Sequence, residues 1–343
     1  MKSNMKKLSC IILLIFISIM PFAGCNAVKA PLVTEELYAL DTIITINIYS
    51  GQKEAIDYAE AEICRLESLL SVTDTNSDIY RINSNPDEFI EVSDECFELI
   101  KTAVDISDAT NGNFDITVYP AVSLWGFTTS EYKVPVKDEI LDAKAKIGYN
   151  KIILDENTKS VKVPFGTSLD LGGIAKGYIA DKAAEVLNQN GVTSALMNFG
   201  GNIRLIGSKP ENEAFKIGIK APFSKGYFAT LNANDTTAST AGGYERYFEE
   251  NGVRYHHILN PHTAAPSESD ILSATVIGDS GAVCDALATA SFVTGSKDIR
   301  SITTQYPDLS FILLTQNEVY LSKALEDDFK LTEEYKNLQI III

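Results

Sequence analysis

The chain has 343 residues, of which 45% are hydrophobic and 22% charged, as in an ordinary soluble globular protein. This length allows one large domain or two small ones. With 46 acidic and 29 basic residues the net charge is −17, which argues against nucleic-acid partners and against binding to anionic lipid by charge alone. The 15 tyrosines and 15 phenylalanines exclude a disordered chain.

The first 24 residues have the features of an export signal. Lys2, Lys6 and Lys7 precede an apolar run over residues 8–20, which has the length of a signal-peptide core and is too short for a transmembrane helix. Small residues then lead into Cys25, as in a bacterial lipobox, where the cysteine is lipidated and becomes the first residue. The alternative is an ordinary signal peptide or anchor that contains a cysteine by chance.

These features predict a lipid-anchored, exported protein. We expect a lipidated cysteine and tether over residues 25–36, one functional domain over residues 37–335 and a C-terminal tail over residues 336–343. The body would then lie at the cell membrane on its extracytoplasmic side, in the periplasm or at the cell exterior.

Residue periodicity predicts mixed helices and strands. In chain order we expect a strand over 37–48, helices over 53–70 and 93–110, a hairpin over 152–163, a helix over 173–190, short strands within 195–255, a strand over 273–277, a helix over 282–293 and an edge strand or tail over 340–343. Ser93 is a plausible N-cap and Gly191 a plausible C′ residue. Without a strict βαβ rhythm, the fold class is α+β, with antiparallel sheets flanked by helices.

The cysteines beyond the leader indicate neither a disulfide framework nor a zinc site. Cys64, Cys96 and Cys284 are odd in number and lack metal-binding spacing. Each lies in an apolar, helix-like context, so we expect buried small hydrophobic side chains.

A strand-to-helix turn at residues 169–177 has an unusual composition. Asp170 ends the strand, Gly172 and Gly173 permit close backbone approach, and Lys176 lies in the first helical turn. Free N–H groups at a helix start attract phosphate, and a bound phosphate would explain a lysine where the helix dipole prefers an acid. Tight packing is the alternative explanation of the two glycines.

Two further segments carry candidate ligands. Asp285 and Thr289 are four residues apart on a predicted helix and therefore share one face, where hard oxygen donors suit an incomplete magnesium shell. All three histidines, His256, His257 and His262, fall within seven residues. Zinc is one reading, but an extended strand would send the first two to opposite faces. There are two other interpretations. One histidine serves a nucleotide pocket or proton transfer, or two histidines form an exposed pair in a hairpin.

Taken in order, several segments resemble the ApbE family of bacterial FAD:protein FMN transferases, from about residue 40 to 332. The segments that carry the resemblance are SVTDTNSDIYRIN, NGNFDITVYPAVSLWGF, LDLGGIAKGYIAD, MNFGGNIRLIG, GYERYF, RYHHILNPHT and SATVIGDSGAVCDALATASFVTG. The resemblance implies a T-fold-like, two-lobed body. It also implies magnesium-dependent transfer of FMN from FAD to a threonine or serine hydroxyl of a partner protein, through a phosphoester and with release of AMP.

The resemblance further implies roles for particular residues. The metal ligands would be Asp285, Thr289 and the backbone carbonyl of Gly173, and His257 would remove the proton of the acceptor hydroxyl, with Asp285 as the second catalytic residue. The FAD contacts would come from Leu40, Asn113, Phe114, Asp115, Asp170, Lys176 and the neighbourhood of Leu259. The acceptor would be a redox protein with an Asp-x-x-Ser/Thr-Gly-Ala-Thr type of motif.

The chain departs from the family pattern at three positions. Thr73 stands where the family usually has an aromatic residue, and Asn260 and His262 replace an acid and an arginine. Three other functions therefore stay open: an FAD pyrophosphatase that gives FMN and AMP, a non-catalytic flavin-binding lipoprotein and an unrelated solute-binding lipoprotein.

Overall fold

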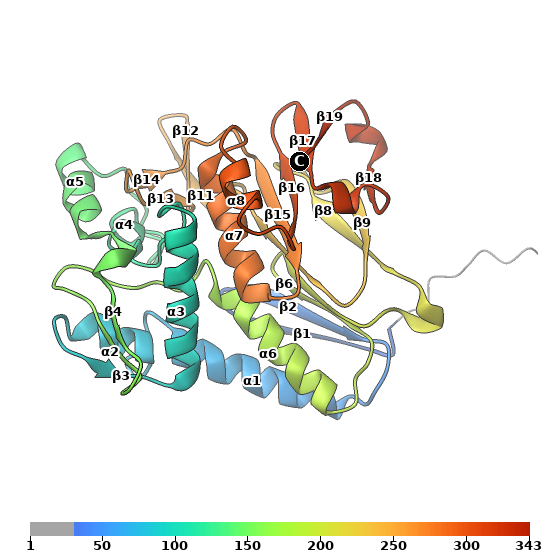
Figure 1. Ribbon diagram of the computed structural model, residues 1–343, viewed down its shortest axis with the longest axis horizontal. Coiled ribbons are helices and arrows are strands. Elements are labelled where there is room, and N and C mark those ends of the chain that lie inside the picture. Colours follow the sequence, from blue (N-terminus) through green and yellow to red (C-terminus); the bar gives the residue numbers. More distant parts are fainter. Residues whose placement is uncertain (1–30) are drawn as a thin grey trace, which may run out of the picture. The chain divides into compact units, whose positions relative to one another are not determined.

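The computed structural model describes residues 31–343, whose centre is a nine-stranded sheet (Figure 1). In spatial order its strands are β1 (Val33–Ala39), β2 (Thr42–Ile48), β6 (Ala195–Phe199), β7 (Asn202–Ile206), β10 (Thr237–Ala241), β15 (Ser273–Gly278), β16 (Ser310–Leu314), β17 (Glu318–Leu321) and β19 (Gln339–Ile342). Neighbouring strands are antiparallel except β17 and β19, which run parallel.

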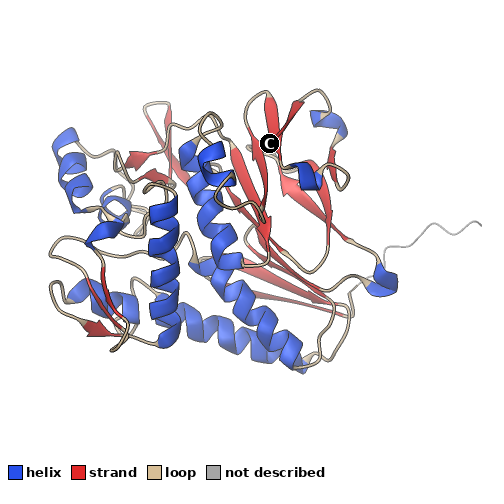
Figure 2. Cartoon of the chain, viewed as in Figure 1, coloured by secondary structure: helices blue, strands red, loops and turns tan. Residues whose placement is uncertain are grey.

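Helices cover one face of this sheet and a small sheet covers the other (Figure 2). The α-helices are α1 (Glu54–Leu70), α2 (Asp78–Ser84), α3 (Asp94–Ala109), α4 (Tyr119–Leu124), α5 (Lys137–Lys146), α6 (Ala175–Gln189), α7 (Gly281–Thr294) and α8 (Arg300–Thr303). Single 3₁₀ turns lie at Tyr149–Lys151, Pro210–Asn212, Lys323–Leu325 and Glu333–Tyr335. The small sheet consists of β8 (Phe215–Lys220), β9 (Tyr227–Ala233) and β18 (Phe329–Leu331).

Three smaller strand groups lie outside these layers. They are β3 (Ile90–Glu91) with β4 (Ile153–Asp155) and β5 (Ser160–Lys162), the hairpin of β11 (Tyr247–Glu250) and β12 (Val253–His256), and the pair of β13 (Leu259–Asn260) and β14 (Ala265–Pro266).

The central strands are buried on both faces, which explains their nearly continuous apolar sequences. In β16, Phe311 and Leu313 pack into the core beneath the helices, whereas Ile312 and Leu314 pack against the small sheet. Alternate side chains of a strand point to opposite faces, so one apolar run supplies both cores.

Helix α7 is apolar on all sides because it lies between the sheet and the neighbouring helices α3 and α6. Its one charged residue is Asp285, which is 6% exposed. A buried acid in such a helix requires hydrogen-bond partners or a cation. The partner of Asp285 lies on α6, at the contact between α6 and α7.

The predicted class, α+β with antiparallel sheets flanked by helices, is confirmed, as are the helices over 53–70 and 93–110 and the hairpin over 152–163. The single strand predicted over 37–48 is wrong. The chain turns at Leu40 and Asp41, whose φ angles of 55° and 57° form a tight turn between β1 and β2. A leucine does not signal such a turn, because positive φ favours glycine or asparagine.

The central sheet includes strands on both sides of the predicted domain. β1 begins inside the predicted tether, and β19 extends the sheet through the predicted tail as an edge strand. Residues 31–343 form one compact unit. Within these residues no helix is both long and apolar enough to cross a membrane. The predicted export signal and Cys25 lie outside the described residues.

The cysteine prediction is correct for two of three residues. Cys96 and Cys284 are buried, whereas Cys64 on α1 is exposed. Cys64 follows the buried residue Ile63 and points away from the core face of the helix, which includes Leu66. The apolar character of its neighbours in sequence did not distinguish these two faces.

Candidate active site

The starts of α6 and α7 meet through the backbone of two glycines, Gly177 and Gly281. A Cβ atom on Gly177 would lie 1.9 Å from the carbonyl oxygen of Gly281, so the two backbones are closer than any side chain permits. The buried carboxylate of Asp285 accepts the backbone N–H of Gly177 through Oδ2 at 3.1 Å. This N–H is one of the first-turn donors that an α-helix cannot satisfy internally.

Gly173, Phe114 and Thr289 form the next layer of this contact. A Cβ atom on Gly173 would lie 3.1 Å from the Phe114 ring and 3.7 Å from the Thr289 hydroxyl oxygen. The absence of a side chain at Gly173 therefore leaves its backbone beside the hydroxyl. Within residues 31–343, Thr289 Oγ1 makes no hydrogen bond to another residue, although its side chain is only partly exposed.

This donor set fits a hard cation. Among residues 31–343, no three or more His, Cys, Asp or Glu side chains gather to hold a metal ion, so the three histidines form no zinc cluster. A cation at the α6–α7 contact would depend on one carboxylate together with neutral hydroxyl and carbonyl oxygens. Magnesium accepts such incomplete oxygen shells and completes them with water and substrate phosphate.

Asp170 and Lys176 lie on either side of the Gly172 peptide. Asp170 Oδ1 accepts the Gly172 N–H at 2.8 Å, and the Lys176 ammonium donates to the Gly172 carbonyl at 3.1 Å. Burial raises the pKa of Asp170, whereas the Gly172 N–H and the charges of Lys176 and Arg246 lower it. The charges of two cations, Lys176 and Arg246, therefore act on this carboxylate.

His257 is held as a neutral imidazole with one nitrogen available. Both its backbone N–H and its Nδ1 contact the carbonyl oxygen of Arg246, at 3.0 and 3.1 Å. A carbonyl only accepts, so Nδ1 carries the proton and Nε2 keeps its lone pair. Burial lowers the pKa of His257 to about 3, and the charges of Arg246 and Lys176 contribute to this shift.

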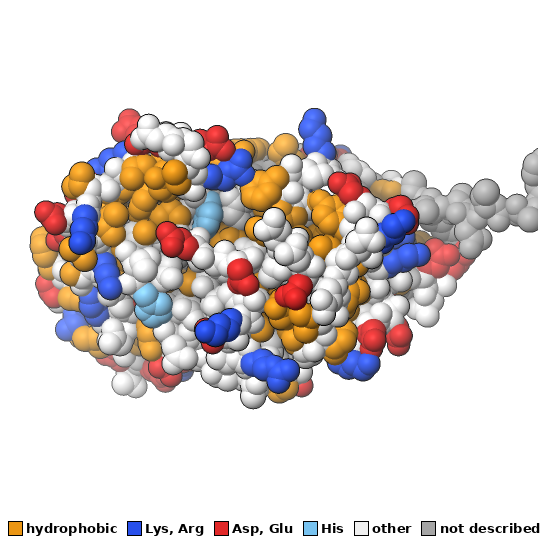
Figure 3. Space-filling view, turned by 90° about the horizontal axis from the view of Figure 1, so that it is seen from above, with side chains coloured by type: hydrophobic (Ala, Val, Ile, Leu, Met, Phe, Trp, Pro, Cys, Tyr) orange, Lys and Arg blue, Asp and Glu red, His pale blue; other side chains and the backbone are white. Residues whose placement is uncertain are grey.

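His256 has a different environment, as the alternation of a strand predicts. Its Nε2 contacts the carbonyl oxygen of Ser267 at 3.0 Å, and its ring packs edge-on against Phe292. The two neighbouring histidines thus have different partners, and only His257 has both Arg246 and Lys176 among the charges that affect it. Figure 3 shows histidine side chains on one face of the molecule, among groups of hydrophobic side chains.

A profile of the ApbE family matches residues 40–313, which is most of the chain. The chain belongs to the ApbE family. It is 34% identical over 278 residues to the FAD:protein FMN transferase of Klebsiella pneumoniae strain 342, covering 80% of this chain and 86% of the relative. It is 30% identical over 298 residues to the FAD:protein FMN transferase of Haemophilus influenzae, covering 84% of this chain and 86% of the relative.

Solved ApbE structures have the same fold. The ApbE protein of Thermotoga maritima superposes with a TM-score of 0.78 at 32% identity, covering 90% of this chain and 99% of the other. The flavinyl transferase ApbE of Pseudomonas stutzeri superposes with a TM-score of 0.73 at 25% identity, covering 89% and 96%.

In this ApbE-family chain the polar side chains of the Asn113 loop, Asn113 and Asp115, are hydrogen-bonded to other residues of the chain. Asn113 donates to the Thr294 hydroxyl at 2.9 Å and so ties the loop to the end of α7. The buried Asp115 carboxylate accepts from the Thr117 N–H, the Thr117 hydroxyl and the Tyr149 N–H at 2.7–2.8 Å. Asp115 therefore shapes the loop that carries the Phe114 ring against Gly173.

Leu40 and Leu259, the other two predicted flavin contacts, lie in a turn and in a short strand. Leu40 occupies the β1–β2 turn, where its N–H donates to Glu67 at 2.6 Å. Leu259 is 6% exposed and packs in a cluster with Trp125 and Phe127, so its side chain serves the core and only its backbone is available to a ligand. Trp125 and Phe127 are likewise buried.

The three departures from the family pattern have distinct surroundings. Thr73 is exposed and its N–H donates to the Ser71 hydroxyl. Asn260 Oδ1 accepts the His262 N–H at 2.8 Å and shapes the turn after β13. His262 lies beside Gly112, next to the Asn113 loop, since a Cβ atom on Gly112 would be 3.4 Å from the imidazole.

The sequence reasoning missed Arg246. Its carbonyl fixes the His257 ring, and its guanidinium donates to the Phe127 carbonyl at 2.5 Å and affects both Asp170 and His257 through its charge. The segment GYERYF contains this residue, but an arginine in a polar turn is ordinarily a solvated surface group. Only the antiparallel approach of the residues before β11 to the end of β12 brings it to the site.

Proposed function

We propose that this chain transfers FMN from FAD to a threonine or serine hydroxyl of a partner protein and releases AMP. The observation that carries the proposal is the meeting of Asp285, Thr289 and the Gly173 backbone at the α6–α7 contact. A flavin-binding protein without chemistry would have no need of a buried carboxylate and an unpaired hydroxyl beside exposed backbone. The names of the relatives support the same activity.

At phosphorus, the reaction forms one P–O bond and breaks another. The acceptor hydroxyl oxygen attacks the phosphorus of the FMN half of FAD, and the bond from that phosphorus to the bridging oxygen breaks, so that AMP leaves. The hydroxyl proton passes to His257 Nε2, whose lone pair is free because Nδ1 donates to Arg246. The nucleophile belongs to the partner, so the chain itself needs no activated serine or cysteine.

Lys176 and Arg246 are suited to hold the pyrophosphate of FAD. Both cations act on Asp170 and His257, so an anion placed among them would be bound by charge-assisted hydrogen bonds. The same anion would offset the positive charges that lower the pKa of His257. Substrate binding would thereby make Nε2 a stronger base at the moment when it is required.

Magnesium fits the remaining oxygen donors, and Gly173 O, Asp285 and Thr289 would hold it. When bound, the ion would neutralise negative charge on the pyrophosphate and stabilise the charge that spreads over the transferring phosphoryl group. These residues, together with His257, provide the orientation and the proton acceptor. No further charged group of the described chain is required.

The partner and the location form a second part of the proposal. The acceptor is a redox protein with an Asp-x-x-Ser/Thr-Gly-Ala-Thr type of motif, and the enzyme is a lipoprotein anchored to the membrane through lipidated Cys25, facing the extracytoplasmic side. The leader composition and the cysteine that follows small residues support this. Labelled palmitate incorporated into the wild type but not into a Cys25→Ser variant would test it.

An intact-mass assay tests the transfer. The chain from residue 26 is incubated with FAD, magnesium and a fragment that carries the acceptor motif, and the expected product is a fragment heavier by one FMN. Asp285→Ala and added EDTA should each abolish the product, whereas Cys64→Ser, a change on the exposed face of α1, should leave it unchanged. FMN and AMP without an adduct would instead establish a pyrophosphatase, and bound but intact FAD would overturn the mechanism.

A further inference from the structure

Where α6 and α7 cross, an aspartate of each helix accepts a hydrogen bond from a backbone N–H of the other. Asp285 of α7 accepts the N–H of Gly177 in α6 at 3.1 Å, and Asp181 of α6 accepts the N–H of Gly281 in α7 at 2.6 Å. Each helix therefore has a glycine in its first turn and an aspartate four residues later that bonds to the other helix. The sequences GYIAD and GAVCD carry the same spacing.

Each carboxylate accepts an N–H group at the start of the other helix, where that helix has no side chain of its own bonded to the same N–H group. No side chain caps the start of α6, whose N-cap residue is Ile174. The N-cap residue of α7, Ser280, accepts only from Val283 at 3.4 Å. A negative charge at a helix N-terminus is favoured by the unpaired N–H groups and the dipole of that helix. The two bonds are thus equivalent in physical terms, and they fix the two helices at one point.

Asp181 differs from Asp285 in having a cation on its other side. Its Oδ1 lies 3.5 Å from Nε of Arg204 on β7. Burial raises the pKa of Asp181 to about 6, whereas the Arg204 charge and the Gly281 N–H lower it, so the carboxylate is ionised at pH 7.5. Asp181 consequently links the sheet, through Arg204, to the start of α7.

We propose that Asp181 is a positioning residue for the metal site, because its bond to Gly281 sets where α7 places Asp285 and Thr289 relative to Gly173. This inference rests on the proposed function, since it assumes that these three residues hold a divalent cation. Asp181 itself does not touch the cation. Its carboxylate is engaged by Gly281 and Arg204, one helical turn beyond Gly177 along α6.

The position of α7 determines where two of the three magnesium ligands, Asp285 and Thr289, lie. Oxygen ligands of magnesium must lie near 2.1 Å in nearly octahedral directions, so a small shift of one ligand is costly. Without the Asp181 acceptor, the start of α7 loses its charged cap and the Arg204 charge loses its partner. α7 then keeps only one of the two carboxylate bonds that fix its start on α6, so its start can shift and carry Asp285 and Thr289 with it. Residues that orient metal ligands in this manner typically contribute about 10–100-fold to metal affinity.

The test measures cation binding directly in the purified full-length protein at pH 7.5. Manganese, which replaces magnesium in oxygen sites and is detected by its electron paramagnetic resonance signal, is titrated into each variant. We expect one site in the wild type, no binding in Asp285→Ala, and affinity at least about tenfold weaker in Asp181→Ala. Asp181→Asn keeps an acceptor oxygen for the Gly281 N–H, and its affinity should lie between those of Asp181→Ala and the wild type.

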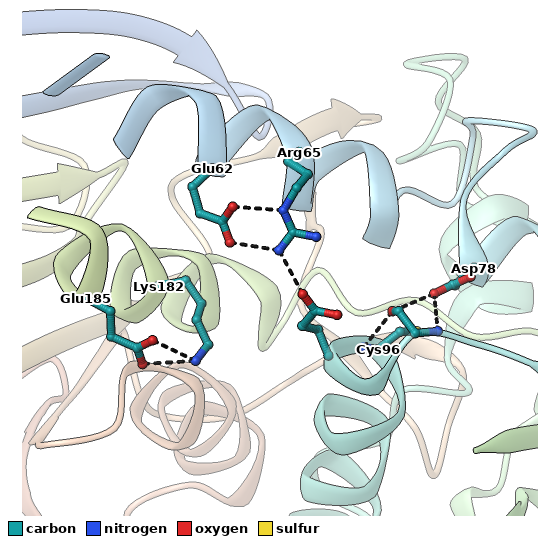
Figure 4. A network of polar contacts seen from close by, with 8 residues as sticks. Glu62, Arg65, Asp78, Cys96, Lys182 and Glu185 are labelled. Carbon is teal, nitrogen blue, oxygen red and sulfur yellow. Dashed lines mark hydrogen bonds and ion pairs between the residues drawn. The ribbon is translucent and has the colours of Figure 1, made fainter. Parts of the chain in front are cut away.

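Asp78 provides the matched control (Figure 4). Like Asp181, it is a buried carboxylate that accepts a backbone N–H where another helix begins, from Ser93 at 2.9 Å, and it pairs with Arg81 at 3.0 Å. Asp78→Asn should lower the melting temperature about as much as Asp181→Asn but leave manganese affinity within twofold of the wild type.

The outcomes separate the two proposals. Absence of manganese binding in the wild type would remove the metal site, and with it the metal part of the proposed function. Wild-type binding together with unchanged affinity in both Asp181 variants would overturn the positioning role alone. Equal weakening by the Asp78 and Asp181 variants would overturn it as well, because the effect would then reflect general loss of stability.

Discussion

Replacing Gly177 by alanine tests the close crossing of α6 and α7 without any reference to substrate. By helix propensity alone, alanine is favoured over glycine by about 1 kcal/mol inside a helix. At this crossing, however, the added methyl group would lie 1.9 Å from the Gly281 carbonyl oxygen. The helices must then separate, which costs about 1–3 kcal/mol as overpacking. The Asp285–Gly177 bond weakens with them, at a further cost of about 1.5–3 kcal/mol for a hydrogen bond to a charged group.

The net expectation is a destabilisation of about 3 kcal/mol, which corresponds to a fall of about 5 °C or more in melting temperature. Thermal unfolding followed by circular dichroism measures it. Gly191→Ala is the control, since that glycine has a φ of 82° but no atom within 4 Å of the added methyl, and it should cost only about 1–2 kcal/mol of backbone strain. A Gly177→Ala protein that melts at or above the wild-type temperature would refute the close crossing.

Three further predictions concern buried groups. Because burial lowers the pKa of His257 to about 3, the unfolded chain binds more protons than the folded chain between pH 3 and 6.5, and acidification through this range destabilises the fold. The His257→Gln variant should therefore show a flatter acid side in a plot of melting temperature against pH. An unchanged slope would contradict this. In the chain from residue 26, a thiol reagent should label Cys64 alone in the native state, because burial shields Cys96 and Cys284 and raises the pKa of both thiols. In denaturant the reagent should label all three cysteines. Labelling of all three in the native state would disprove the burial of Cys96 and Cys284. Trp125→Phe removes an indole N–H bond of 2.9 Å to a buried backbone carbonyl, and urea unfolding should show a loss of about 1–2 kcal/mol, whereas an unchanged midpoint would show that water replaces the bond.

The local patterns of the sequence were sufficient for the four longest helices, α1, α3, α6 and α7, but not for the shorter α2, α4, α5 and α8. Ile56, Ala59, Ile63 and Leu66 recur at helical spacing and form the buried face of α1, because a 3.6-residue period places them on one side. Ser93 was recognisable as an N-cap because its hydroxyl is the acceptor that a helix start requires, and it accepts the Cys96 N–H. For the same reason, the spacing of Asp285 and Thr289 already placed both on one face of a helix.

Contacts between distant segments decided what the sequence left open. The role of Arg246 depends on which segments pack together at the site, and no local period encodes that. Asp181 and Gly281 are 100 residues apart in the chain, yet they are joined at 2.6 Å because two glycines let α6 and α7 approach. The sequence by itself determined the four longest helices, the family resemblance and the candidate ligands, since these follow from local spacing and residue chemistry. Only the tertiary structure brought Gly173, Asp285 and His257 into defined environments, because backbone approach and burial arise from packing between segments far apart in sequence.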